Sequence, residues 1–99
     1  MTFQQLYYLL EVEKTGSFSL AAKKMFVTQS TISNAVAGLE KEVGSPIFVR
    51  GKKTLTLTPA GEEILAHAKR ICESHKYITI KKHPIQDVFV KNIVKNKFF

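Results

Sequence analysis

The chain has 99 residues, which is enough for one small domain with a single modest core and excludes a catalytic domain beside a second module. Its 15 Lys and Arg against 8 Asp and Glu give a formal net charge of +7, and 44% of its residues are hydrophobic, which excludes a disordered composition. A basic surface indicates an acidic partner, namely nucleic acid, an anionic membrane or an acidic protein.

The positive charge is concentrated near the end of the sequence. Residues 76–99 carry six basic and one acidic side chain, a net +5, which leaves +2 for residues 1–75. The single cysteine, Cys72, excludes an internal disulfide, and no uncharged run reaches the roughly 18 residues of a membrane span. Without a secretory signal at the N-terminus, we expect a cytoplasmic protein.

The first predicted element is a helix over residues 3–14. Thr2 and Gln5 have the spacing of a capping box, and Gly16 is placed to end the helix. Its predicted apolar stripe comprises Phe3, Leu6, Tyr7 and Leu10.

Two further helices follow at once. We expect Ser19 to cap a short helix over residues 20–25, and Thr28 to cap a third helix that ends at Gly44, before Pro46. The predicted buried face of the third helix consists of Ile32, Val36, Leu39 and Val43.

A hairpin and a long helix complete the order. Residues 47–50 and the alternating residues 54–58 are predicted strands around a basic turn. Thr58 followed by Pro59 is a strong helix start, and the fourth helix is expected to reach residue 80. An apolar seam of this helix, suited to a partner helix, contains Ile64, Ala68, Ile71, His75 and Ile78.

This order predicts a mainly α fold, a winged helix-turn-helix of three helices and a β-hairpin wing followed by a long linker helix. We expect the winged helix-turn-helix domain over residues 1–58 and a linker or dimerisation helix over residues 59–80. Residues 81–99 form a basic tail that is either disordered or a short helix.

The polar face of the third helix carries the functional hypothesis. It consists of Ser30, Ser33, Asn34, Ala37 and Lys41, opposite the apolar face. Such short side chains allow a helix to enter the major groove, which is about 12 Å wide. Gln29 and Asn34 can offer amides to adenine, and the hydroxyls of Ser30, Thr31 and Ser33 can bind bases or phosphates. A merely solvated helix face is the alternative.

The turn of the predicted hairpin is basic. Arg50, Lys52 and Lys53 cluster there and can straddle a phosphate backbone or enter a minor groove. The alternative is a charged edge that prevents strand aggregation. The two interpretations are compatible, and the position beside a helix-turn-helix favours nucleic-acid binding.

Five sequence blocks occur in a specific order and spacing: GSFSLAA at 16–22, VTQSTIS at 27–33, LEKEVG at 39–44, IFVR at 47–50 and LTPAG at 57–61. Together they resemble the N-terminal DNA-binding domain of the bacterial LysR-type transcriptional regulators, over about 70 residues. The resemblance implies that the third helix enters the major groove. The DNA contacts that it implies are Thr28, Gln29, Ser33 and Asn34, with Arg50, Lys52 and Lys53 on the backbone.

The resemblance also implies homodimerisation, with the fourth helix pairing antiparallel with its twin through Ile64, Ala68, Ile71 and His75. Two positions depart from the family pattern. Ser30 stands where proline is frequent, and Asn34 stands where arginine is common. An arginine would supply a strong guanine or phosphate contact, so the half-site preference of relatives does not carry over.

Full-length members of the family carry a larger effector-binding domain after the linker helix, whereas this sequence departs from the family pattern after about Glu73. An excised domain, a naturally short regulator and a gene product with a disrupted frame are all compatible with that change. We expect no ligand response from the chain alone.

The resulting prediction is a transcription regulator of the LysR type, without its effector domain, that binds double-stranded DNA sequence-specifically as a homodimer. The alternative is a protein-interaction module that pairs through the linker helix with full-length relatives as a dominant negative. No residue set could activate a nucleophile, so an enzyme is not expected, and neither is a cofactor, a metal or a membrane. We expect Cys72 to be a small buried apolar residue rather than a metal ligand.

Overall fold

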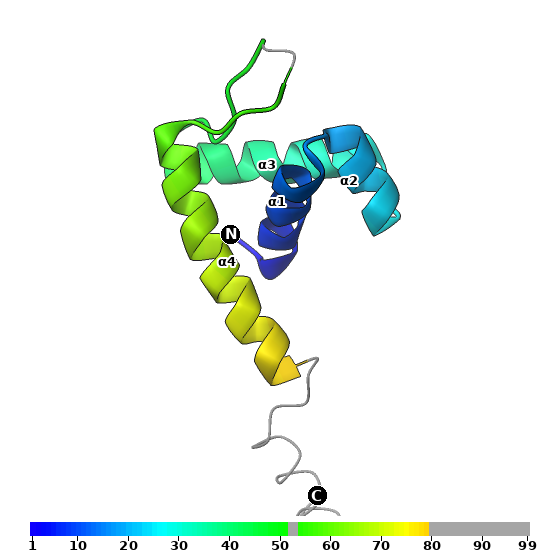
Figure 1. Ribbon diagram of the computed structural model, residues 1–99, viewed down its shortest axis with the longest axis vertical. Helices are drawn as coiled ribbons and strands as arrows, with labels where there is room; N and C mark the ends of the chain where they lie inside the picture. Colours follow the sequence, from blue (N-terminus) through cyan, green and yellow to red (C-terminus); the bar gives the residue numbers. More distant parts are fainter. Residues whose placement is uncertain (52–53, 80–99) are drawn as a thin grey trace, which may run out of the picture. The chain divides into compact units, whose positions relative to one another are not determined.

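The computed structural model describes residues 1–51 and 54–79 (Figure 1). Its helices are α1 (Phe3–Thr15), α2 (Phe18–Met25), α3 (Gln29–Val43) and α4 (Pro59–Thr79). The chain divides into two units, residues 1–69 and the part from residue 70 onward, and α4 contributes to both. The predicted mainly α fold is confirmed. The predictions for Lys52, Lys53 and the tail 81–99 lie outside the described residues.

Helix α1 begins and ends as its sequence predicts. The Gln5 N–H donates to Thr2 Oγ1 at 3.1 Å, and the Thr2 N–H donates to Gln5 Oε1 at 2.8 Å. Gly16 takes the left-handed conformation (φ 74°) that ends the helix. The predicted apolar stripe was partly wrong, because Phe3 is 48% exposed. Leu6 is buried as predicted, and Tyr7 and Leu10 are half-buried. Packing against α2 and α3 also buries Tyr8, Leu9 and Val12, which the predicted stripe did not include.

Helix α2 begins earlier than predicted, at Phe18, and its cap is Ser17 rather than Ser19. Ser17 is extended (φ −157°), and its side chain accepts a hydrogen bond from the Leu20 N–H at 3.1 Å. The Phe18 ring also makes an edge-to-face contact with Phe48, with ring centroids 5.8 Å apart. A tertiary contact therefore reinforces the earlier start.

Helix α3 runs from its Thr28 cap to Gly44, which is left-handed (φ 75°), as predicted. Of the predicted buried face, the first three members, Ile32, Val36 and Leu39, are 0% exposed. The fourth, Val43, was wrongly predicted, since it is 42% exposed. It is the last helical residue, and the chain turns away at Gly44 directly after it.

The wing is a hairpin rather than the two regular strands predicted over 47–50 and 54–58. In its described part the two arms form one antiparallel bridge, between Phe48 and Leu57. The Val49 N–H donates to the Thr56 carbonyl at 2.8 Å beside that bridge. Ile47 and Phe48 are consecutive, yet both are buried. Consecutive residues of an extended arm point to opposite faces, so burial at this point does not follow the alternation of a half-buried strand.

The first turn of α4 lies directly against the first arm of the wing. Thr58 Oγ1 accepts from the Gly61 N–H at 2.9 Å and donates to the Pro46 carbonyl at 2.6 Å. Gly61 is buried, and a Cβ atom on it would lie 2.1 Å from the Ile47 carbonyl oxygen. Only glycine therefore permits this approach of helix and wing.

The turn between α2 and α3 contains the one non-glycine residue with a positive φ in the described part of the chain. Phe26 has φ 59° and ψ 42°, and its N–H bonds to the carbonyls at the end of α2. Its side chain is 94% exposed. A bulky residue thus occupies a conformation that suits glycine, without burial of its ring as compensation.

None of the helices in residues 1–51 and 54–79 has the combination of length and apolar character needed to cross a membrane.

We predict that Gly61→Ala lowers the free energy of unfolding by roughly 3 kcal/mol, because the new methyl group would collide with backbone that cannot swing aside. Urea denaturation followed by circular dichroism measures the change. The control is Glu63→Ala at an exposed position of the same helix, expected within about 0.5 kcal/mol of wild type. Equal stability of Gly61→Ala and wild type would contradict the close approach.

We predict that Phe26→Gly raises the free energy of unfolding by up to about 1 kcal/mol, because it relieves the left-handed strain and removes no buried contact. Thermal denaturation should show a higher Tm. Ala66→Gly, at an exposed interior position of α4, should instead lower the stability by about 1 kcal/mol. A lower Tm for both variants would show that the Phe26 ring has a structural role.

Candidate nucleic-acid interface

The N-terminal half of α3 brings most of the predicted site residues together on one surface. Among them, Thr28, Gln29, Ser30, Thr31 and Asn34 are exposed, and Ser33 is half-buried. Ala37 and Lys41 continue the exposed face towards the C-terminal end of the helix. This face lies opposite the buried row of the same helix, so a ligand can reach it without disturbing the core.

The hydroxyl groups at the start of α3 are engaged in capping the helix. Thr28 Oγ1 accepts from the Thr31 N–H at 3.3 Å and lies 2.8 Å from Thr31 Oγ1 and 3.2 Å from Ser30 Oγ. The side-chain amides of Gln29 and Asn34, by contrast, make no hydrogen bond to another described residue. The amide groups are therefore the donors and acceptors that α3 leaves available for base edges.

A long stretch of the sequence that includes this face contains no acidic residue. Between Lys14 and Glu40 the sequence has no Asp or Glu, and the first turn of α3 lacks an acidic residue. Lys23 and Lys24, in the last turn of α2, are both exposed. Sequence reasoning did not single out these two lysines. The acid-free stretch was the signal that could have found them, because it favours a polyanionic ligand.

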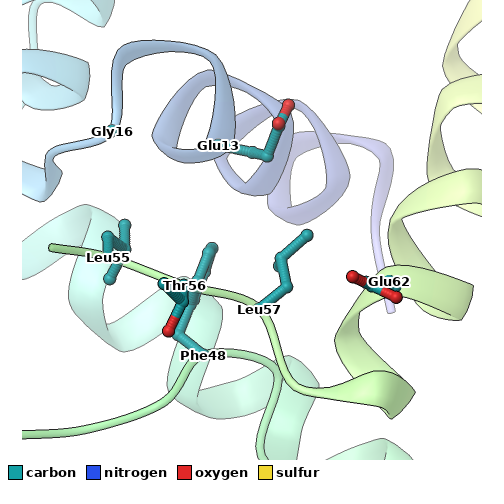
Figure 2. A pocket seen from close by; sticks show the side chains of 7 residues that line it. All are labelled: Glu13, Gly16, Phe48, Leu55, Thr56, Leu57 and Glu62. Carbon is teal, nitrogen blue, oxygen red and sulfur yellow. The ribbon is translucent and has the colours of Figure 1, made fainter. Parts of the chain in front are cut away.

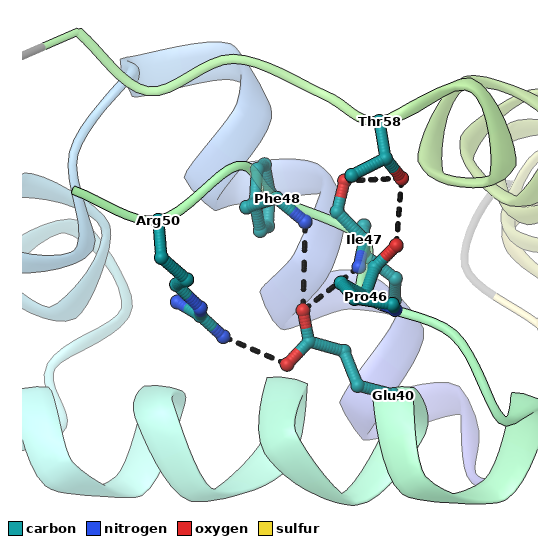
Figure 3. A network of polar contacts seen from close by, with 6 residues as sticks. All are labelled: Glu40, Pro46, Ile47, Phe48, Arg50 and Thr58. Atoms are coloured by element: carbon teal, nitrogen blue, oxygen red, sulfur yellow. Dashed lines mark hydrogen bonds and ion pairs between the residues drawn. The ribbon is translucent and has the colours of Figure 1, made fainter. Parts of the chain in front are cut away.

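Glu40 joins α3 to the first arm of the wing (Figure 3). Its Oε2 accepts from the Ile47 N–H at 2.8 Å and from the Phe48 N–H at 3.4 Å, and its Oε1 forms an ion pair with Arg50 Nη2 at 2.7 Å. The Glu40 side chain is 14% exposed and that of Arg50 is 59% exposed. Sequence reasoning gave Glu40 no role, because its partners lie seven to ten residues away in a segment that only the fold brings back to α3.

Arg50 is thus exposed as predicted, and its guanidinium is held by a carboxylate. One nitrogen of the planar fork contacts Glu40, which leaves the remaining N–H groups of a five-donor cation for another acceptor.

A cleft of about 300 Å³ lies beneath the second arm of the wing (Figure 2). Its lining residues are Glu13, Gly16, Phe48, Leu55, Thr56, Leu57 and Glu62. Glu13 and Glu62 come from different helices, with Leu57 between them (Figure 2). Two carboxylates over an apolar floor repel phosphate, so this cleft is not part of a polyanion-binding surface.

The residues of the predicted apolar seam of α4 differ in how far their side chains are buried. In the unit of residues 1–69, Ala68 is 1% exposed and belongs to the core of its own chain, together with Leu65, while Ile64 is half-buried. In the following unit Ile71 is 39% exposed, and His75 is half-buried. Dimerisation through this row of α4 stays a prediction. Ala68 has little exposed surface left to contribute to such a contact.

Cys72 is 3% exposed, which confirms its prediction as a small buried residue. Burial raises the pKa of its thiol, and the neighbouring Lys76 ammonium offsets part of that rise. The thiol is therefore protonated at neutral pH and a poor nucleophile. Within the described ranges, no three His, Cys, Asp or Glu side chains lie close enough together to hold a metal ion.

Comparison with known proteins assigns the fold to a family. The family described as "Bacterial regulatory helix-turn-helix protein, lysR family" matches residues 3–62. A probable nitrogen assimilation transcriptional activator of Synechococcus elongatus is 47% identical over 73 residues, which cover 74% of this chain and 23% of that protein. The transcriptional regulator MetR of Haemophilus influenzae is 38% identical over 71 residues, or 72% and 23% of the two chains. The chain thus spans about a quarter of the length of these curated relatives.

Solved structures give the same assignment. The DNA-binding domain of BenM, in complex with catB site 1 DNA, is similar with a TM-score of 0.79 at 26% identity, over 86% of this chain and 96% of that one. The DNA-binding domain of CbnR in complex with DNA has a TM-score of 0.75 at 32% identity, over 83% and 94% of the two chains. The arrangement of α2, α3 and wing is therefore the DNA-binding fold of a regulator rather than an enzyme, and the chain belongs to the LysR family of bacterial helix-turn-helix regulatory proteins.

Proposed function

We propose that this chain binds double-stranded DNA sequence-specifically as a homodimer and thereby regulates transcription. The observation that carries the proposal is the exposed face of α3, which offers two amides that bond to no other described residue, in a stretch of sequence without Asp or Glu. The DNA complexes of BenM and CbnR, whose domains have the same fold, support it. The proposal places the chain in the cytoplasm, with the chromosome that it reads.

In this proposal the side-chain amides of α3 recognise the DNA bases. Gln29 and Asn34 can each present a paired donor and acceptor to adenine in the major groove. The hydroxyls of Ser30, Thr31 and Ser33 and the cap residue Thr28 lie at the positive end of the helix, where phosphate oxygens bind favourably.

Phosphate contacts come from the flanking cations. The exposed residues Lys23 and Lys24 adjoin the start of α3, and Arg50 lies on the wing arm that Glu40 ties to the same helix. Lys52 and Lys53 add charge to the wing by sequence. The contacts of the lysines position the protein on any duplex, so they supply affinity without sequence information.

The exposed apolar side chains of α4 support pairing with another copy. Ile71, Tyr77 and Ile78 are 39%, 47% and 58% exposed, and a group of exposed apolar side chains on one helix is typical of a protein-interaction surface. A homodimer would present two copies of α3 to an interrupted palindrome. The same surface could pair with a full-length relative, which is the basis of the alternative function as an interaction module.

We predict different effects for base and phosphate contacts. A selection from a random duplex pool supplies a preferred site, and Kd is then measured on that site and on an unrelated duplex at several salt concentrations. Gln29→Ala should weaken the preferred site by roughly tenfold and the unrelated duplex little. Lys52→Ala should weaken both alike and reduce the salt dependence of binding.

Gln4→Ala and Lys69→Ala are matched controls, because both residues are exposed and lie outside the proposed interface. If neither Gln29→Ala nor Lys52→Ala changed binding more than its control, the assigned docking face would be wrong.

We predict that the chain sediments with twice its 11.2 kDa mass, and that Ile78→Asp shifts it to the monomer by placing a charge in an apolar contact. Analytical ultracentrifugation measures both species, with Lys76→Asp as the control at an exposed polar position. A wild-type chain that stays monomeric at micromolar concentration would contradict the homodimer. A dimer that shifts no duplex would favour the interaction module.

A further inference from the structure

Glu40 is a carboxylate whose two oxygens are both occupied. One accepts from the backbone amides of Ile47 and Phe48, and the other is paired with the Arg50 guanidinium (Figure 3). At 14% exposure the group has lost most of its water, and a desolvated carboxylate is tolerated when such donors replace that water. Glu40 is therefore firmly held and, in turn, holds the chain segment that leaves α3.

The same helix carries the proposed base-reading residues and this anchor. Asn34 and Glu40 are six residues apart, which corresponds to about 9 Å along a helix that rises 1.5 Å per residue. A rigid helix thus fixes the distance between the amides of its N-terminal half and the point where the wing is attached. When α3 lies in the groove, this distance therefore determines where the wing meets the DNA backbone.

The ion pair also determines what Arg50 can do. In the free protein the pair carries no net charge, so Arg50 adds little to the long-range attraction of DNA. Its side chain is nevertheless 59% exposed, and a single nitrogen contacts Glu40. The carboxylate therefore holds one end of the guanidinium against α3 while leaving N–H groups for a phosphate.

We propose that Glu40 is a positioning residue for DNA recognition. It holds the first arm of the wing on α3 and orients the Arg50 guanidinium, so that Arg50 binds one backbone phosphate in register with the bases that α3 reads. Arg50 then contributes directed hydrogen bonds and thereby specificity, whereas the wing lysines contribute undirected charge. This inference rests on the proposed DNA-binding function.

The test is Glu40→Gln, measured by Kd on the selected site and on an unrelated duplex and by thermal denaturation. The glutamine oxygen can still accept from the Ile47 N–H, whereas the ion pair with Arg50 is lost. We expect a roughly tenfold loss of affinity for the selected site and no loss for the unrelated duplex, because the net charge rises by one. Glu42→Gln is the matched control, since Glu42 lies on the same helix, pairs with the N-terminal ammonium of Met1 and gives the same charge change.

Arg50 variants complete the experiment, and the two single Arg50 variants do not depend on the folding of Glu40→Gln. Arg50→Lys keeps the charge and loses the planar fork, so it should weaken the selected site and leave the unrelated duplex unchanged. Arg50→Gln should lower the affinity for the selected site, and the Glu40→Gln/Arg50→Gln double variant should be no weaker there than the single variants, as expected for residues that act as one unit.

The proposal is overturned if Glu40→Gln behaves like Glu42→Gln, if it weakens both duplexes equally, or if Arg50→Lys matches wild type on the selected site. A wild-type chain that prefers no duplex sequence would overturn the proposed function instead, and the inference with it. If the wild-type chain and Glu40→Gln prefer the selected site over the unrelated duplex to the same degree, only the positioning role of Glu40 is overturned.

Discussion

Ile47 is fixed between α3 and α4, and the position of the wing depends on that attachment. Its N–H is bound by Glu40 at 2.8 Å, its carbonyl accepts from the Thr58 N–H at 2.9 Å, and its side chain is fully buried. The Gly61 backbone meets the same carbonyl so closely that no side chain fits. Since the backbone of one residue is held from two helices, the wing leaves the core in one direction and keeps its distance from α3.

The distribution of charge follows from the same arrangement. The stretch from Lys14 to the residue before Glu40 is free of acidic groups and includes the exposed start of α3, whereas Glu13 and Glu62 line a cleft under the second arm. Glu40 itself is neutralised by Arg50. The start of α3 therefore favours a polyanionic ligand and the cleft disfavours one, although the net charge of residues 1–75 is only +2.

Local signals predicted the ends of the helices well. The caps at Thr2 and Thr28 and the left-handed glycines 16 and 44 depend on bonds within a few residues, which a sequence displays directly. The same reasoning failed at Ser19, because Ser17 and Ser19 are both plausible caps and a contact between Phe18 and Phe48 accompanies the earlier start. It failed at Val43 as well, since periodicity shows which residues share a face but not where the neighbouring helices stop.

By itself, the sequence determined the four helices, the polar face of α3, the basic wing and the family, because spacing, caps and blocks of residues are properties of neighbours along the chain. Only the tertiary structure decided that Glu40 anchors the wing, that Arg50 is paired and that Ala68 faces its own core. These features join groups that are distant in sequence or depend on how helices approach one another. Their burial and hydrogen bonds exist only after the core has closed around Ile47.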